Sequence, residues 1–214
     1  MLRQFGAIVV CCSILAAQKT GPERKVEGNV VTSERDPKVR IRLPRSAQYV
    51  GGDRFVLYDM ADCELHAFVE ADEHKNVGRL YWVQFEGYLP TRPELQHTYD
   101  SPRHANLGGM DFYVDTWIRA KKEPTRRGSD LEHIVDLIEG RGYQLPDGMV
   151  YVRLVYLFHE KRKELLIIYA EDSTATGLTA AELQPNGKAK GPWAGIEKGL
   201  FERAERSVEV ERIP

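Results

Sequence analysis

The chain has 214 residues, of which 42% are hydrophobic and 29% are charged, and its formal net charge is −2. This is the composition of an ordinary globular protein long enough for one generous domain, and it excludes the basic footprint that nucleic-acid binding requires. We therefore expect a single folded domain and no nucleic-acid partner.

The first 18 residues have the pattern of an export signal. Arg3 is followed by an apolar run from Phe5 to Ala17, which has the length of a secretory hydrophobic region and is too short to span a bilayer. We expect residues 1–18 to be a signal peptide that is removed. The mature protein is then secreted or periplasmic, without stable membrane insertion. A buried N-terminal strand or helix is the alternative.

The segment that follows is charged and rich in turn-forming residues. Residues 19–37 show little periodicity, which predicts a flexible spacer before a single domain at 38–214. Removal of the signal peptide also removes Cys11 and Cys12. Because Cys63 is then the one cysteine that remains, the exported chain cannot form an internal disulfide and depends on its core for stability.

Alternation of apolar and polar residues predicts the strands. Ordered structure is expected to begin near residues 39–44, and further strands are predicted at 54–59, 63–70, 78–87, 110–119, 149–158 and 164–171. Short connections around Ala61, Lys75 and Lys161 favour antiparallel hairpins.

Two helices are predicted from apolar stripes. The first, at about 130–140, begins with a capping box from Ser129 to Glu132, a common helix start. The second, at about 193–209, follows Pro192, which suits a first helical turn. A capping-box spacing at Thr179 predicts a further short helical turn.

This order of elements predicts the α+β class, with an antiparallel β-sheet of about six to seven strands and the two main helices packed on one face. The order resembles the layout of the Mog1/PsbP-like sandwich, whose chain also ends in a hairpin and a C-terminal helix. The resemblance concerns layout alone and includes no signature residues.

Period-two positions separate two faces of the predicted sheet. The first set is almost wholly apolar, so we expect it to be buried under the helices, with Cys63 as an inert core thiol. This set comprises Cys63, Leu65, Ala67, Val69, Tyr81, Val83, Phe85, Phe112, Val114, Ile118, Val152, Leu154, Leu165 and Ile167.

The opposite set mixes aromatic, charged and apolar side chains, as the walls of ligand pockets do. It comprises Glu64, His66, Phe68, Glu70, Leu80, Trp82, Gln84, Glu86, Tyr113, Asp115, Trp117, Arg119, Tyr151, Arg153, Val155 and Leu157. The other interpretation is a solvated sheet face on which aromatic residues form cross-strand pairs.

The long connection at 91–110 is the second candidate region, because long loops in compact domains are often functional. His97 and His104 with Asp100 could supply metal ligands or an acid–base pair. Their spacing matches no zinc signature, and a polar surface loop is the alternative. We predict no metal and no cofactor.

These observations favour an exported, non-catalytic ligand-binding or protein-interaction domain that uses the mixed face and the 91–110 loop. Its partner is a small molecule or a protein, and the oligomeric state is open. The candidate ligand-binding residues are His66, Trp82, Gln84, Glu86, Tyr113, Asp115, Trp117, Arg153, His97, Tyr99 and His104.

Two alternatives stay open. One is a small hydrolase or lyase in which His66 acts as an acid or base beside Glu64, Glu86 or Asp115, because a neighbouring carboxylate tunes the pKa of an imidazole. The other is a structural domain that assembles through the same face.

Overall fold

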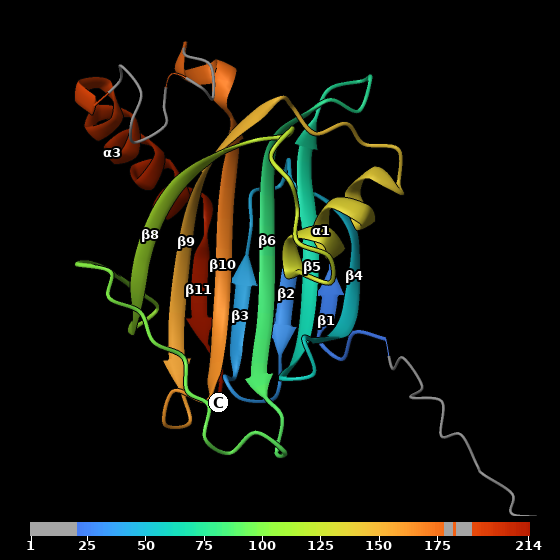
Figure 1. Ribbon diagram of the computed structural model, residues 1–214, viewed down its shortest axis with the longest axis vertical. Coiled ribbons are helices and arrows are strands. Elements are labelled where there is room, and N and C mark those ends of the chain that lie inside the picture. Colours follow the sequence, from blue (N-terminus) through green and yellow to red (C-terminus); the bar gives the residue numbers. More distant parts are fainter. Residues whose placement is uncertain (1–20, 178–181, 183–189) are drawn as a thin grey trace, which may run out of the picture.

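The computed structural model describes residues 21–177, 182 and 190–214. The expected signal peptide and most of the turn expected after Thr179 lie outside these residues. The larger of two sheets has seven antiparallel strands (Figure 1). In spatial order they are β4 (Gln48–Leu57), β5 (Ala61–Ala71), β6 (Val77–Tyr88), β10 (Lys163–Asp172), β9 (Gly148–Phe158), β8 (Met110–Ala120) and β7 (Arg103–Leu107). The α+β class and the antiparallel sheet are confirmed.

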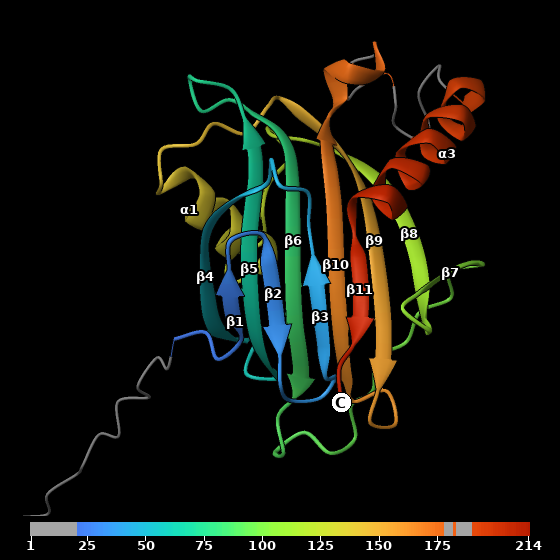
Figure 2. The same ribbon diagram turned by 180° about the vertical axis from the view of Figure 1, so that it is seen from behind.

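A second sheet has four short strands and lies against one face of the large sheet (Figure 2). Its strands are β1 (Lys25–Glu27), β2 (Val30–Ser33), β3 (Val39–Arg42) and β11 (Glu209–Arg212). The β1–β2 hairpin lies in the segment expected to be a spacer, so that expectation is wrong for residues 25–33. Strands of three and four residues leave too short a pattern to recognise, although Val31 is fully buried.

The two helices cover opposite faces of the large sheet, which corrects the expectation of a single covered face (Figures 1 and 2). Helix α3 (Lys190–Ser207) places Leu200 and Ala204 in the core shared by the two sheets. Helix α1 (Asp130–Glu139) buries Ile134 and Ile138 against the other face. We call the second surface the α1 face. A short 3-10 helix, η1 (Ser173–Thr176), follows β10.

The ends of the helices follow local rules. The Ser129 half of the predicted capping box is present, because Ser129 Oγ accepts a hydrogen bond from the backbone N–H of Glu132 at 3.1 Å. The Glu132 side chain accepts from the backbone N–H of Gly128 at 2.6 Å instead of from that of Ser129. Helix α3 ends two residues earlier than expected, and the remaining residues lead into β11. The β7–β8 hairpin turns at Gly108 and Gly109, both with positive φ, as two-residue hairpin turns require.

The register of the large sheet corrects one strand of the face assignment. Leu65 lies opposite Gln84, and His66 lies opposite Val83. The even positions of β5, His66 among them, therefore face the small sheet, and the odd positions, Cys63 among them, face α1. Strand β5 is buried at Ala61 and continuously from Cys63 to Val69, so its alternation does not reveal which face is which. Burial raises the pKa of the Cys63 thiol, in agreement with an inert core residue.

Candidate functional site

All of the candidate ligand-binding residues except His66 lie on the α1 face or on the loop that crosses it. One row across the sheet contains Trp82, Ile168, Arg153 and Asp115, from β6, β10, β9 and β8. The β6–β7 loop, residues 89–102, passes from the lower end of β6 across the front of β10 and β9 (Figure 1). The sheet pairing and this loop together assemble the site.

The β6 part of the face is sealed. Trp82 is 3% exposed and Gln84 is fully buried. Trp82 Nε1 donates to Gln84 Oε1 at 3.0 Å, and Gln84 Nε2 donates to Glu86 Oε2 at 3.0 Å. These two candidates therefore belong to a second core, and their polar groups point along the strand toward Glu86.

A pair of carboxylates lies at the end of this chain of hydrogen bonds. Glu86 on β6 is the direct cross-strand partner of Glu164 on β10, which is buried. Burial, and then the charge of Glu86, raises the pKa of Glu164 to about 8, and burial also raises the pKa of Glu86. Asp130, at the start of α1, adds negative charge to both, and burial raises its own pKa.

The β6–β7 loop brings two more polar side chains to this pair. His97 Nδ1 lies 3.2 Å from Glu164 Oε2, and Tyr99 Oη donates to the same oxygen at 2.8 Å. The His97 ring stacks on Tyr88 with 4.3 Å between centroids. Burial lowers the pKa of His97 to about 4, so the imidazole is neutral at pH 7. Among the described residues, its Nε2 has no hydrogen-bond partner.

Arg162, which precedes β10, holds this loop in place. Its guanidinium donates to four backbone carbonyls of the loop, those of Leu89, Arg92, Pro93 and Leu95. The backbone N–H of His97 also donates to the carbonyl of Lys161 at 2.7 Å. The position of His97 is thus set by the β9–β10 turn, far away in sequence.

Among the described residues, one cluster could hold a metal ion, and it consists of Glu86, His97 and Glu164. One ligand-type atom from each lies within 4.8 Å of the other two. Carboxylate oxygen and imidazole nitrogen are ligands for divalent transition metals. The combination of His97, His104 and Asp100 suggested by the loop sequence does not assemble, because His104 pairs instead with Asp111 at 2.8 Å.

The β8–β9 part of the face is half open. Arg153 on β9 is 31% exposed, and its Nη2 donates to Asp115 Oδ2 at 2.7 Å. The guanidinium lies over the rings of Tyr99 and Trp117, 5.0 Å and 5.7 Å from their centroids. Arg153 Nε is buried and has no partner among the described residues.

Further aromatic rings extend this surface toward the sheet edge. Trp117 stacks in parallel on Tyr151, with 4.8 Å between centroids. Tyr113 lies 6.0 Å from Tyr99 and 4.6 Å from His104, again between ring centroids. Several predicted residues therefore meet around Arg153, in a surface of flat rings with one cation at its centre.

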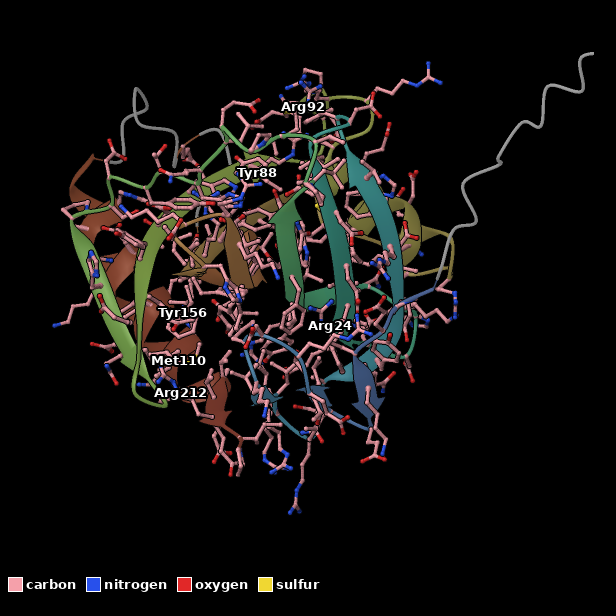
Figure 3. The ribbon with its side chains drawn as sticks, turned by 90° about the horizontal axis from the view of Figure 1, so that it is seen from below. Arg24, Tyr88, Arg92, Met110, Tyr156 and Arg212 are labelled. Atoms are coloured by element: carbon pink, nitrogen blue, oxygen red, sulfur yellow. The ribbon has the colours of Figure 1, made fainter. Side chains whose placement is uncertain are left out.

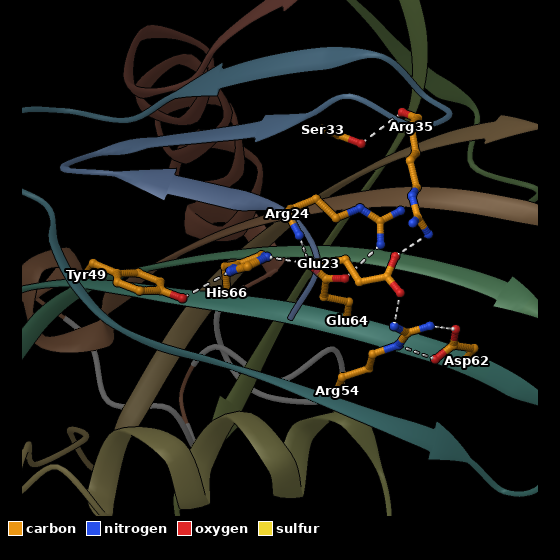
Figure 4. Close-up of polar contacts among 9 residues, drawn as sticks. All are labelled: Glu23, Arg24, Ser33, Arg35, Tyr49, Arg54, Asp62, Glu64 and His66. Carbon is orange, nitrogen blue, oxygen red and sulfur yellow. Dashed lines mark hydrogen bonds and ion pairs between the residues drawn. The ribbon is translucent and has the colours of Figure 1, made fainter. Parts of the chain in front are cut away.

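His66 occupies the other face, in a buried network between the two sheets (Figure 4). Its Nε2 lies 3.0 Å from Glu64 Oε1, and its Nδ1 lies 3.1 Å from Tyr49 Oη. Glu64 also accepts hydrogen bonds from the backbone N–H and the Nη1 of Arg24, at 2.7 Å and 2.8 Å. The expected neighbour Glu64 is present. The pairings with Glu86 and Asp115 are wrong, because the sheet separates them from His66.

A cavity of about 410 Å³ opens beside this network at the lower end of the molecule (Figure 3). Arg24 and Tyr88, both labelled in that view, line it together with Glu64, Phe85 and Lys163. His66 is fully buried and does not line the cavity. Its two ring nitrogens are both engaged, so the imidazole has no direct access to a substrate in this cavity.

Sequence reasoning missed two members of the site, Glu164 and Asp130. Glu164 is the second residue of β10, and the residues that follow it are all apolar as far as Ala170. Glu164 shares a face of the strand with Leu166 and Ile168, which are buried. This position could have indicated a functional carboxylate, because burial of a lone carboxylate is costly. Asp130 gave no such signal, since an acidic residue in a first helical turn is common.

No protein-family model, curated protein or solved structure matches this chain. The resemblance to the Mog1/PsbP-like layout therefore rests on element order alone, and here a strand, β11, follows the last helix. None of the helices in the described part of the chain is long and apolar enough to cross a membrane.

Proposed function

We propose that this protein is an exported, non-catalytic binding domain that recognises a small molecule on the half-open part of the α1 face. One observation carries the proposal: the Arg153 guanidinium is partly exposed and is held by Tyr99, Trp117 and Asp115. A cation held in this way is preorganised, so little conformational entropy is lost when a ligand binds.

The chemistry of this surface indicates the class of ligand. A guanidinium has five N–H donors, and Arg153 makes one hydrogen bond within the described chain. Because Nε is buried, a ligand meets the Nη groups, and a carboxylate or phosphate group can accept hydrogen bonds from them. The flat rings of Trp117 and Tyr113 suit a planar or apolar body. The ligand is therefore a small aromatic or apolar acid.

Titration with benzoate, indole-3-acetate and phenyl phosphate tests this function, with tryptophan fluorescence and calorimetry as readouts. We expect saturable binding of at least one probe, weakened about tenfold or more by Arg153→Ala or Trp117→Ala. Arg42→Ala is the matched control, because Arg42 is an exposed arginine on β3 whose partner is Glu209. Absence of binding by all three probes, or equal binding by wild type and Arg153→Ala, contradicts the proposal.

The alternatives have less support. A hydrolase or lyase based on His66 needs solvent access, and that imidazole is 0% exposed with both nitrogens engaged. Assembly through the α1 face needs a flat patch of roughly 800 Å² per partner, whereas α1 and the β6–β7 loop already cover part of that face (Figure 1).

A further inference from the structure

We propose that Glu86, His97 and Glu164 form a binding site for a divalent transition-metal ion, with Zn²⁺ as the reference ion. The three side chains come from three separate elements: β6, the β6–β7 loop and β10. Their ligand-type atoms lie within 4.8 Å of one another. Bonds of about 2.0–2.2 Å in tetrahedral geometry place ligand atoms roughly 3.5 Å apart, so rotation of the side chains by about 1 Å closes the site.

The negative charges around this cluster favour the binding of a cation. Glu86 and Glu164 are direct cross-strand partners, and the carboxylate of Asp130 acts on both. The charge of Arg153 acts on Glu164 while its hydrogen bond goes to Asp115, and the charge of Arg162 acts on His97. A divalent ion compensates the buried carboxylate of Glu164 and the partly buried one of Glu86 directly, and a bound ion is often the largest local charge in such a site.

His97 provides independent support for the site, because its imidazole is held in a fixed position and one ring nitrogen has no hydrogen-bond partner among the described residues. Its side chain is 6% exposed, Nδ1 points at Glu164, and Nε2 has no partner among the described residues. Buried polar atoms are normally hydrogen-bonded. Two rigid features hold the ring, the stack on Tyr88 and the backbone hydrogen bond to Lys161. One ring nitrogen of this imidazole offers an electron pair, which a metal ion between Glu86 and Glu164 would accept.

Neighbouring side chains orient the carboxylates as outer partners of metal ligands do. Gln84 Nε2 donates to Glu86 Oε2 at 3.0 Å, and Tyr99 Oη donates to Glu164 Oε2 at 2.8 Å. The contacts of Glu164 with Tyr99 and His97 both use Oε2, so its Oε1 is open to an ion. The mixture of two carboxylates and one imidazole favours a transition metal over Ca²⁺ or Mg²⁺, which prefer sites made wholly of oxygen.

Calorimetry and equilibrium dialysis of chelator-treated protein with Zn²⁺ alone test this site. We expect one ion per chain, at least about tenfold weaker binding of Ca²⁺, and loss of Zn²⁺ affinity by about 100-fold in Glu164→Gln and His97→Gln. His104→Gln is the matched control, because His104 belongs to the same region but is exposed and paired with Asp111. This variant should bind Zn²⁺ like the wild type.

The melting temperature without metal separates a lost ligand from a lost fold. Glu164→Gln removes the buried member of two adjacent carboxylates, so the metal-free variant should melt at the wild-type temperature or higher. Failure of the wild type to bind Zn²⁺, or unchanged affinity in both ligand variants, overturns the site. Arg153→Ala should retain Zn²⁺ binding, so failure of the aromatic acids to bind would count against the proposed function and not against the metal site.

Discussion

Trp82 and Trp117 lie on the same face of the large sheet, but only Trp82 is a buried member of the apolar cluster that includes α1. Trp82 is 3% exposed among the apolar side chains of β5 and β10, and Trp117 is half-buried on the open side of Arg153. Residues of one alternation class thus differ in burial. We expect Trp82 to stabilise the fold and propose that Trp117 takes part in recognition.

This division predicts different costs for two alanine substitutions. Trp82→Ala opens a cavity in the second core and should lower the free energy of unfolding by roughly 3–5 kcal/mol. Trp117→Ala loses one stack on Tyr151 and should cost roughly 1–2 kcal/mol. Urea denaturation followed by circular dichroism measures both. A larger loss in Trp117→Ala than in Trp82→Ala would contradict the assignment.

At the scale of elements, each helix holds one face of the large sheet through a few apolar side chains. Ile134 on α1 and Leu200 on α3 are almost fully buried, on opposite faces. The two helices therefore stabilise separate cores within one molecule.

Ile134→Asp and Leu200→Asp should each cost roughly 4 kcal/mol or more and give unfolded or insoluble protein, because each buries an unpaired charge. Lys198→Asp is the control on α3, since Lys198 is exposed and its substitution should change stability by less than about 0.5 kcal/mol. Thermal melts of the three variants test this. A soluble Leu200→Asp with the wild-type melting temperature would show that α3 contributes little to the core.

Strands with clear alternation could be predicted from sequence together with the faces they present. The pattern in β6, β8 and β9 placed Trp82, Asp115 and Arg153 on one face, and the register confirms it. Strand β5 is almost wholly buried, so its phase and the position of His66 could not be predicted. Nor could the contact of Glu86 with Glu164, which depends on a pairing between strands far apart in sequence.

For the whole molecule, the network around Glu64 joins the N-terminal part of the described chain to the large sheet. Arg24, just before β1, donates two hydrogen bonds to Glu64 on β5, in the space between the sheets (Figures 3 and 4). Burial raises the pKa of Glu64, but hydrogen bonds from His66, the backbone and Arg24 outweigh it, and the pKa falls from 4.5 to about 2.

A lowered carboxyl pKa makes the protein sensitive to acid. The stabilisation from Glu64, roughly 3 kcal/mol for such a shift, is fully present above about pH 4.5 and is lost as the pH falls toward 2. Glu64→Gln should therefore be less stable than the wild type at pH 7, and the difference should shrink in acid. Urea denaturation at a series of pH values tests this, with the exposed Glu73→Gln as control. A constant difference between pH 7 and pH 2.5 would refute it.

The order of strands in the large sheet also sets the order in which it can form. Strand β10 lies between β6 and β9, so the hairpins made earlier in synthesis cannot join until residue 172 has been made. Until then β6 presents a long, unpaired and largely apolar edge, and such edges bind other chains readily. Pairing of β6 with β10 also has high contact order, which slows folding. In a nascent chain the β6 edge therefore stays unpaired from the completion of β6 at residue 88 until β10 is complete at residue 172.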